Sequence, residues 1–113
     1  IISTGFFYDR GPMMEQTLSS IHALFRANIR GLRRMGAAAL DMSWVAAGRF
    51  AGFFEYELAP WDYAAGWLIV EEAGGICLDR SANEMTLDAG SVITACPAIC
   101  SEFLGVVRWP GVA

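Results

Sequence analysis

Segments that favour β-strands alternate with segments that favour α-helices along the whole chain, which limits the folds available to it. Apolar residues fall at helical spacing over 13–28, and an alanine-rich helical stretch follows at 38–47. β-favouring runs begin at Ile1 and recur at 32–35, 50–56, 76–79 and 91–96. Further helices are expected from Pro60 to the glycine pair at 74–75 and from 97 to about 107. The resulting order, β-α-β-α-β-α-β-β-α, predicts an α/β fold: one layered domain over residues 1–113, with a mixed sheet flanked by helices.

The composition is more apolar than a free-standing domain of this size requires. Hydrophobic residues make up 55% of the 113 residues, and the mean hydropathy is +0.39. This excess predicts an exposed apolar patch of the kind that contacts a partner. The chain begins at Ile1 rather than at Met, inside a β-favouring run. We therefore expect it to be a piece of a larger protein.

Charge and run length argue against nucleic-acid and membrane partners. The formal net charge is −4, whereas proteins that follow a phosphate backbone carry a basic stripe. The one local basic cluster, Arg30, Arg33 and Arg34, is either a solvated rim beside a strand or an anion contact. The longest apolar run, 64–70, is far shorter than the roughly 18 residues that a membrane helix needs. We expect no nucleic-acid partner and no membrane partner.

Cysteine usage indicates the compartment. Cys77, Cys96 and Cys100 are odd in number, and their spacing matches no zinc site. The single histidine, His22, cannot complete such a site. Reduced, buried thiols in a cytoplasmic protein are the expectation.

Asp62 stands just inside the most apolar part of the chain, the stretch 59–75. With Pro60 near the first helical position, Asp62 lies in the first turn, where the helix dipole favours a negative charge by roughly 0.3–1 kcal/mol. The other interpretation is a ligand for a hard cation such as Mg²⁺, since helix starts in α/β folds border the ligand crevice. Ala65, Gly66, Ile69 and Ala73 follow on the same side, which we expect to pack closely against a neighbour.

Two further elements are candidates for the same crevice. Glu55 ends the aromatic strand seven residues before Asp62, and Gly36 with the following alanines forms a turn with bare backbone amides. Such a turn either binds a polar ligand or simply packs tightly. Glu71 and Glu72 lie further along the helix and are expected to face solvent. The sequence has no G-x-S-x-G elbow, P-loop or dinucleotide fingerprint.

These residues resemble a known family. The stretch PWDYAAGWLIVEEAGG is similar to the C-terminal signature of the inositol monophosphatase family, Trp-Asp-x-Ala-Ala-Gly, an apolar run and Glu-Ala-Gly-Gly. Upstream, RRMGAAALDMSWVAAGRFAGFFEYEL resembles the Arg-x-x-Gly-Ser-Ala-Ala-Leu-Asp segment and the strand after it, and STGFFYDR resembles the strand that opens the family's second half. The resemblance covers the whole chain in order. It implies the C-terminal domain of the inositol monophosphatase and sugar phosphatase fold.

The resemblance also implies an activity and a set of site residues. Family members are Mg²⁺-dependent, lithium-sensitive phosphomonoesterases that act on small phosphorylated substrates, have a layered α-β-α-β-α fold and commonly form homodimers. By resemblance, Asp62 is a metal ligand, and Glu55 contacts substrate hydroxyls. Gly36, Ala37 and Ala38 correspond to the Gly-Ser/Thr-Ala turn that contacts the substrate. No other catalytic residue is assigned to this chain.

Two departures and one gap qualify the resemblance. Ala37 replaces the usual Ser or Thr, and Ala51 stands where an acid is common. The family's Asp-Pro-Ile/Leu-Asp-Gly-Thr motif and its Glu-Glu pair, which belong to a missing N-terminal domain, are not in this sequence. We therefore predict part of an inositol-monophosphatase-like enzyme, inactive by itself. Adenosine bisphosphate nucleotidase and fructose bisphosphatase activities stay open, and the alternative is a non-catalytic interaction module that retains the fold.

Overall fold

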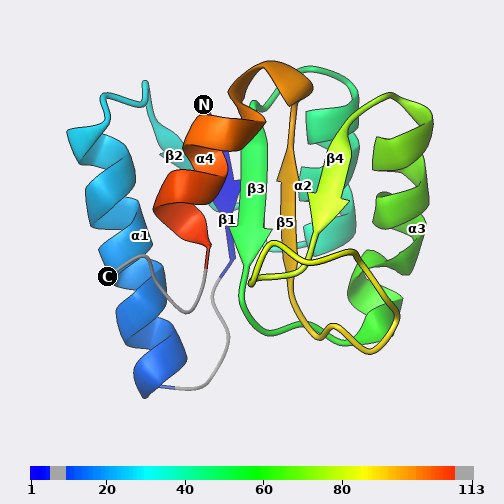
Figure 1. The fold of residues 1–113 in the computed structure, drawn as a ribbon, viewed down its shortest axis with the longest axis horizontal. Coiled ribbons are helices and arrows are strands. Elements are labelled where there is room, and N and C mark those ends of the chain that lie inside the picture. Colours follow the sequence, from blue (N-terminus) through cyan, green and yellow to red (C-terminus); the bar gives the residue numbers. More distant parts are fainter. Residues whose placement is uncertain (6–9, 109–113) are drawn as a thin grey trace.

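The computed structural model describes residues 1–5 and 10–108, and its elements follow the predicted order (Figure 1). Residues 6–9, the second half of the first predicted strand, lie outside the described residues. The last helix begins three residues later than expected, because residues 97–99 form a 3₁₀ turn. The elements are β1 (Ile2–Thr4), α1 (Pro12–Arg26), β2 (Leu32–Arg33), α2 (Ala38–Ala46), β3 (Gly52–Glu55), α3 (Pro60–Glu72), β4 (Ile76–Leu78), β5 (Val92–Ala95), η1 (Pro97–Ile99) and α4 (Cys100–Val107).

The five strands form one mixed sheet in the order β2-β1-β3-β5-β4. β1 runs parallel to both β2 and β3, with Ile2 opposite Gly52 and Thr4 opposite Phe54. β5 runs antiparallel to β3 and to β4. The sheet confirms the predicted fold class. It places the carboxyl ends of three adjacent parallel strands at one edge of the sheet.

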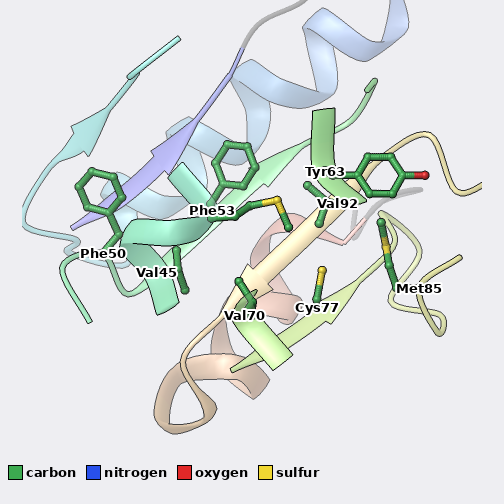
Figure 2. Packing of buried hydrophobic residues seen from close by; sticks show 9 residues of the cluster. Val45, Phe50, Phe53, Tyr63, Val70, Cys77, Met85 and Val92 are labelled. Carbon is green, nitrogen blue, oxygen red and sulfur yellow. The ribbon is translucent and has the colours of Figure 1, made fainter. Parts of the chain in front are cut away.

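Helices cover both faces of this sheet, because successive strand residues point to opposite sides. Phe53 packs with residues of α2 and α3, whereas Phe54 packs with residues of α1 and α4. Figure 2 shows the first cluster, in which Val45 of α2 and Val70 of α3 lie among side chains of the sheet. The domain therefore has three layers, with the sheet in the middle.

α3 buries a different face from the one that we predicted. Tyr63, Gly66 and Val70 are its buried residues, while Ala65 and Ile69 are exposed. We expected Gly66 to admit another backbone; the close neighbour is instead the side chain of Met42, since a Cβ on Gly66 would lie 2.8 Å from Met42 Sδ and 2.9 Å from Met42 Cβ. The error has a physical cause: α3 is apolar on every side, so periodicity does not identify its packed face.

The cysteine prediction holds only in part. All three thiols are free, but Cys77 alone is buried, and Cys96 and Cys100 are half-buried. Burial raises the pKa of the Cys77 thiol to about 12, so this thiol is inert at neutral pH. Within residues 10–108, no helix combines the length and the apolar content that crossing a membrane requires.

Candidate active site

A cavity of about 370 Å³ lies at the carboxyl ends of the parallel strands. Three of its lining residues mark those ends, since Gly5 directly follows β1, Arg34 directly follows β2 and Glu55 is the last residue of β3. Ligands of open α/β sheets bind at this edge, where the loops that leave the strands converge. The position alone makes this cavity the candidate site.

Two helices begin at the same cavity. Ala37 and Ala38, at the start of α2, line it together with Trp61 and Asp62 from the first turn of α3. The first N–H groups of a helix have no partner within the helix and carry its positive partial charge. The start of α2 therefore offers backbone donors to an anionic group, such as a phosphate. At the start of α3, Pro60 has no N–H, and the N–H groups of Ala59 and Asp62 already donate to Asp62 Oδ2 and to the carbonyl of Ala59.

The structure brings together every residue that the sequence analysis placed in the site. Gly36, Ala37, Ala38, Glu55 and Asp62 all line the cavity. Gly36 has φ +87°, a left-handed conformation that favours glycine, and it turns the chain from β2 into α2. Glu71 and Glu72 are exposed on the far turns of α3, as predicted.

Asp62 is a helix cap as well as a lining residue. Its Oδ2 accepts a hydrogen bond from the backbone N–H of Ala59, at 3.0 Å. Ala59 has no side-chain oxygen, so only this half of a capping box exists. The other oxygen of Asp62, Oδ1, takes no part in the bond and is available to a further ligand. The cap interpretation is thus confirmed without excluding the ligand interpretation.

Gly5 makes room for the carboxylate of Glu55. A Cβ on Gly5 would overlap Glu55 Oε1 and lie 2.5 Å from Glu55 Cδ. Gly5 is itself buried, at the end of β1 next to β3. The position of the Glu55 side chain therefore depends on the absence of a side chain across the strand pair.

The carboxylates of the cavity influence one another. Burial, together with the negative charges of Asp41 and Asp62, raises the pKa of Glu55 to about 7, and Arg34 opposes part of the rise. Near neutral pH, Glu55 is therefore distributed between its protonated and ionised forms. A perturbed acid in a cleft is typical of functional sites.

Sequence reasoning missed Asp41, which is the most buried acid of the cavity. Only 1% of Asp41 is exposed, and its Oδ1 has no hydrogen-bond partner within the described residues. Burial raises its pKa to about 6, and the nearby hydroxyl of Ser3 offsets part of the rise. The sequence did carry a signal, because Asp41, like Asp62, is an acid in the first turn of an apolar helix. Gly5 was also missed as a lining residue, whereas Arg34 belongs to the basic cluster for which the sequence left an anion contact open.

The donor set fits a metal ion only in part. Over residues 1–5 and 10–108, no group of three His, Cys, Asp or Glu side chains is placed to hold one. Asp62 lines the cavity, its Oδ1 takes no part in the bond to Ala59 N, and a carboxylate oxygen is a suitable ligand for Mg²⁺. A complete site needs further oxygen ligands from outside these residues.

Two related proteins match most of the chain in sequence. A putative Nus factor SuhB from Neisseria meningitidis serogroup B is 45% identical over 107 residues, which cover 95% of this chain and 41% of the relative. An inositol-1-monophosphatase from Rhizobium meliloti is 45% identical over 82 residues, covering 73% of this chain and 31% of the relative. The chain thus spans less than half the length of these relatives.

Solved structures show the same fold. The extragenic suppressor protein suhB from Bartonella henselae superposes with a TM-score of 0.85 at 34% identity, covering 97% of this chain and 42% of that one. The Thermotoga maritima IMPase superposes with a TM-score of 0.80, also at 34% identity, covering 94% of this chain and 39% of that one. The model of the inositol monophosphatase family matches residues 1–106. This chain belongs to the inositol monophosphatase family.

Proposed function

We propose that this chain is the C-terminal part of a Mg²⁺-dependent phosphomonoesterase that hydrolyses inositol monophosphate or a similar small phosphate ester. The observation that carries the proposal is one cavity at the strand ends, which gathers Asp62, Glu55 and the amides that open α2. Family membership adds support, because the relatives with similar sequences include a protein named inositol-1-monophosphatase.

Each part of the cavity has a role that suits its chemistry. The N–H groups of the turn at Gly36, Ala37 and Ala38 are donors for phosphate oxygens, and the start of α2 is electropositive. Glu55, held at the end of β3, accepts a hydrogen bond from a substrate hydroxyl when it is ionised. Ala37 offers no hydroxyl of its own, so that part of the turn binds only through its backbone.

Asp62 is the metal ligand of the proposal. Its Oδ1 would hold Mg²⁺, while Oδ2 keeps the carboxylate fixed against Ala59 N. Bound Mg²⁺ in such sites neutralises charge on the transferring phosphoryl group and lowers the pKa of a bound water. The remaining ligands would come from the part of the protein that the full-length relatives have and this chain lacks. We therefore expect the isolated chain to be inactive.

A non-catalytic interaction module is the second candidate function. The relatives named Nus factor SuhB, one of them 45% identical, favour it. The lack of a three-ligand set within residues 1–5 and 10–108 is compatible with it as well. On this view the fold persists, and the cavity binds no metal.

A chimera separates the two candidates. In it, this chain replaces the matching 41% of the Neisseria meningitidis relative, and inositol 1-phosphate hydrolysis is measured with and without Mg²⁺. Mg²⁺-dependent turnover by the chimera but not by the 113-residue chain supports the phosphatase. Robust turnover by the isolated chain would contradict a metal site that needs ligands from another part of the protein. A folded chimera that neither binds Mg²⁺ nor hydrolyses the ester supports the module, provided that the unmodified relative is active in the same assay.

A further inference from the structure

Asp41 is an acid of the cavity to which the proposed function gives no role. It lies in the first turn of α2 and lines the cavity, yet only 1% of it is exposed. Its Oδ1 has no hydrogen-bond partner among residues 1–5 and 10–108. A buried carboxylate without a partner is costly when it is ionised. The position of Asp41 therefore favours its neutral, protonated form.

The donors for an anion lie on the same turn of α2. The N–H of Asp41 donates to the carbonyl of Ala37, at 3.0 Å, and so closes the first turn. The helix N–H groups before it have no acceptor within the helix, and residues 36–39 line the cavity. An anion bound to them lies about one helical turn, roughly 5 Å along the axis, from the backbone of Asp41. An ionised Asp41 repels such an anion through the weakly screened interior, and a protonated Asp41 does not.

We infer that Asp41 makes anion binding at the start of α2 proton-linked, so that the site takes up a dianion, such as a phosphate or sulfate group, together with a proton on Asp41. The proton comes from the solvent, and no bond of the anion is broken. Asp41 acts through its charge rather than by touching the anion, because its Oδ1 is buried. The inference rests on the anion-binding part of the proposed function and adds the charge state in which that part works.

The range over which Asp41 titrates supports this role. Burial raises the pKa of Asp41 to about 6, and the nearby hydroxyl of Ser3 offsets part of the rise. A dianion at the turn disfavours the ionised form further, so its binding raises this pKa and draws in a proton near neutral pH. Ser3 does not fix the protonation state, because a hydroxyl can donate to an ionised acid or accept from a neutral one.

Other charged groups share the cavity with Asp41. Glu55 comes from β3, Asp62 from α3 and Arg34 from the residue after β2. β1, β5 and the rest of α2 carry no charged residue, and the other acids of α3 are exposed at its far end. The pKa of Glu55 is raised to about 7, so this acid titrates in an overlapping range. A test of Asp41 must therefore separate it from Glu55.

Sulfate binding measures the linkage, because sulfate keeps its charge at these pH values whereas a phosphate ester does not. In metal-free Glu55→Gln chain, sulfate titrations are followed through the backbone amide NMR signals of residues 36–39. The dissociation constant should rise about tenfold between about pH 4.5 and pH 7.5, as expected for one nearby charge. Adding Asp41→Asn should limit the rise to less than about twofold, and adding Asp88→Asn, at an exposed loop position, should leave it unchanged.

The pH profile separates charge from structure. A merely structural role of Asp41 would let Asp41→Asn weaken sulfate binding at every pH without changing the slope. Asp62 and Arg34 are present in every variant, so they do not account for a difference between variants. An equally steep rise with Asp41→Asn, or no sulfate binding at residues 36–39 at low pH, would overturn the inference.

A second measurement covers variants that do not fold. In the unmodified chain, the carboxyl carbons of Asp41 and Glu55 are titrated separately by NMR, with and without saturating sulfate. Because linkage is reciprocal, a tenfold effect of pH on affinity requires the pKa of Asp41 to rise by about one unit when sulfate is bound. A rise at Glu55 alone would assign the linkage to Glu55 and contradict the role of Asp41.

The sulfate titration and the enzyme assay fail independently. Proton-linked sulfate binding by the chain, with no turnover by the chimera, upholds the role of Asp41 and contradicts the proposed function. Mg²⁺-dependent turnover by the chimera, with sulfate binding that does not depend on Asp41, contradicts the role of Asp41 alone.

Discussion

The carboxylate of Glu55 occupies the space that a side chain on Gly5 would need. The two residues lie at the ends of β3 and β1, which are neighbouring parallel strands. This relationship connects a backbone position with the chemistry of the cavity, because the placement of Glu55 depends on a residue that contributes no side chain.

Replacing Gly5 should therefore disturb the site. Gly5→Ala forces Glu55 to move or the strands to shift, and we expect the free energy of unfolding to fall by about 1–3 kcal/mol, as for other overpacked buried sites. Urea unfolding of the 113-residue chain measures this. Gly105→Ala is the control, because its Cβ meets no atom within 4 Å and lies in α4, where alanine should raise the stability by about 0.5–1 kcal/mol. In a Glu55→Ala background the cost of Gly5→Ala should shrink; an unchanged cost would show that the two residues are not coupled.

Two substitutions at Asp62 separate its two roles. Asp62→Ala removes the acceptor for Ala59 N–H and the charge at the start of α3, so unfolding should become easier by about 1 kcal/mol. Asp62→Asn keeps an acceptor oxygen and should lose less than half of that. In the chimera, both variants should lose Mg²⁺-dependent turnover. A fully active Asp62→Asn chimera would rule out the metal-ligand role, and wild-type stability of Asp62→Ala would rule out the cap.

Asp41 should make stability depend on pH in a definite direction. Its pKa is raised from 3.8 to about 6 in the folded chain, so between these values the folded state holds more protons than the unfolded state. Stability from this group is therefore highest at low pH, falls as pH rises through this interval by up to about 3 kcal/mol, and is level above it. Glu55, raised from 4.5 to about 7, acts in the same direction.

Asp41→Asn should flatten this dependence. Unfolding free energies between pH 4 and pH 8 measure it, with Asp88→Asn at an exposed loop position as the control. We expect the control to follow the wild-type profile. An Asp41→Asn profile as steep as that of the wild type would assign the pH dependence to other groups.

Gly66→Ala tests the close packing of α2 against α3. Alanine usually stabilises a helix interior by about 0.5–1 kcal/mol relative to glycine, but here its Cβ would lie 2.9 Å from Met42 Cβ. We expect a net loss of about 1–3 kcal/mol in the free energy of unfolding, because the two helices must separate. A stabilised variant would mean that the helices have room to spare.

The sequence predicted the fold better than the packing. Element order followed from periodicity and from glycine and proline positions, since these are local properties. The buried face of α3 did not follow, because an apolar helix offers several equivalent faces, and Met42 of a distant segment selects the one containing Gly66. Local pattern cannot report a contact between residues 24 positions apart.

The residues of the candidate site were likewise predictable from the sequence only in part. Gly36, Glu55 and Asp62 were found because each ends or begins an element, and the sheet brings such positions to one edge. Asp41 was not found, since its significance is its burial and its unpartnered oxygen, and both arise only from tertiary packing. Residue type and spacing do not show directly whether a side chain is buried.

The strand order also separates the elements that line the cavity from the elements that only stabilise the sheet. Among the described residues, those that line the cavity all lie between residues 5 and 62, whereas β4, β5 and α4 contribute none. Yet β5 occupies the place beside β3, and β4 joins the sheet only through β5. The last third of the chain thus supports the sheet without lining the cavity. Its residues can differ between relatives as long as the sheet is maintained. Variants of that region should alter unfolding free energies while leaving ligand preference untouched, so the two measurements should vary independently.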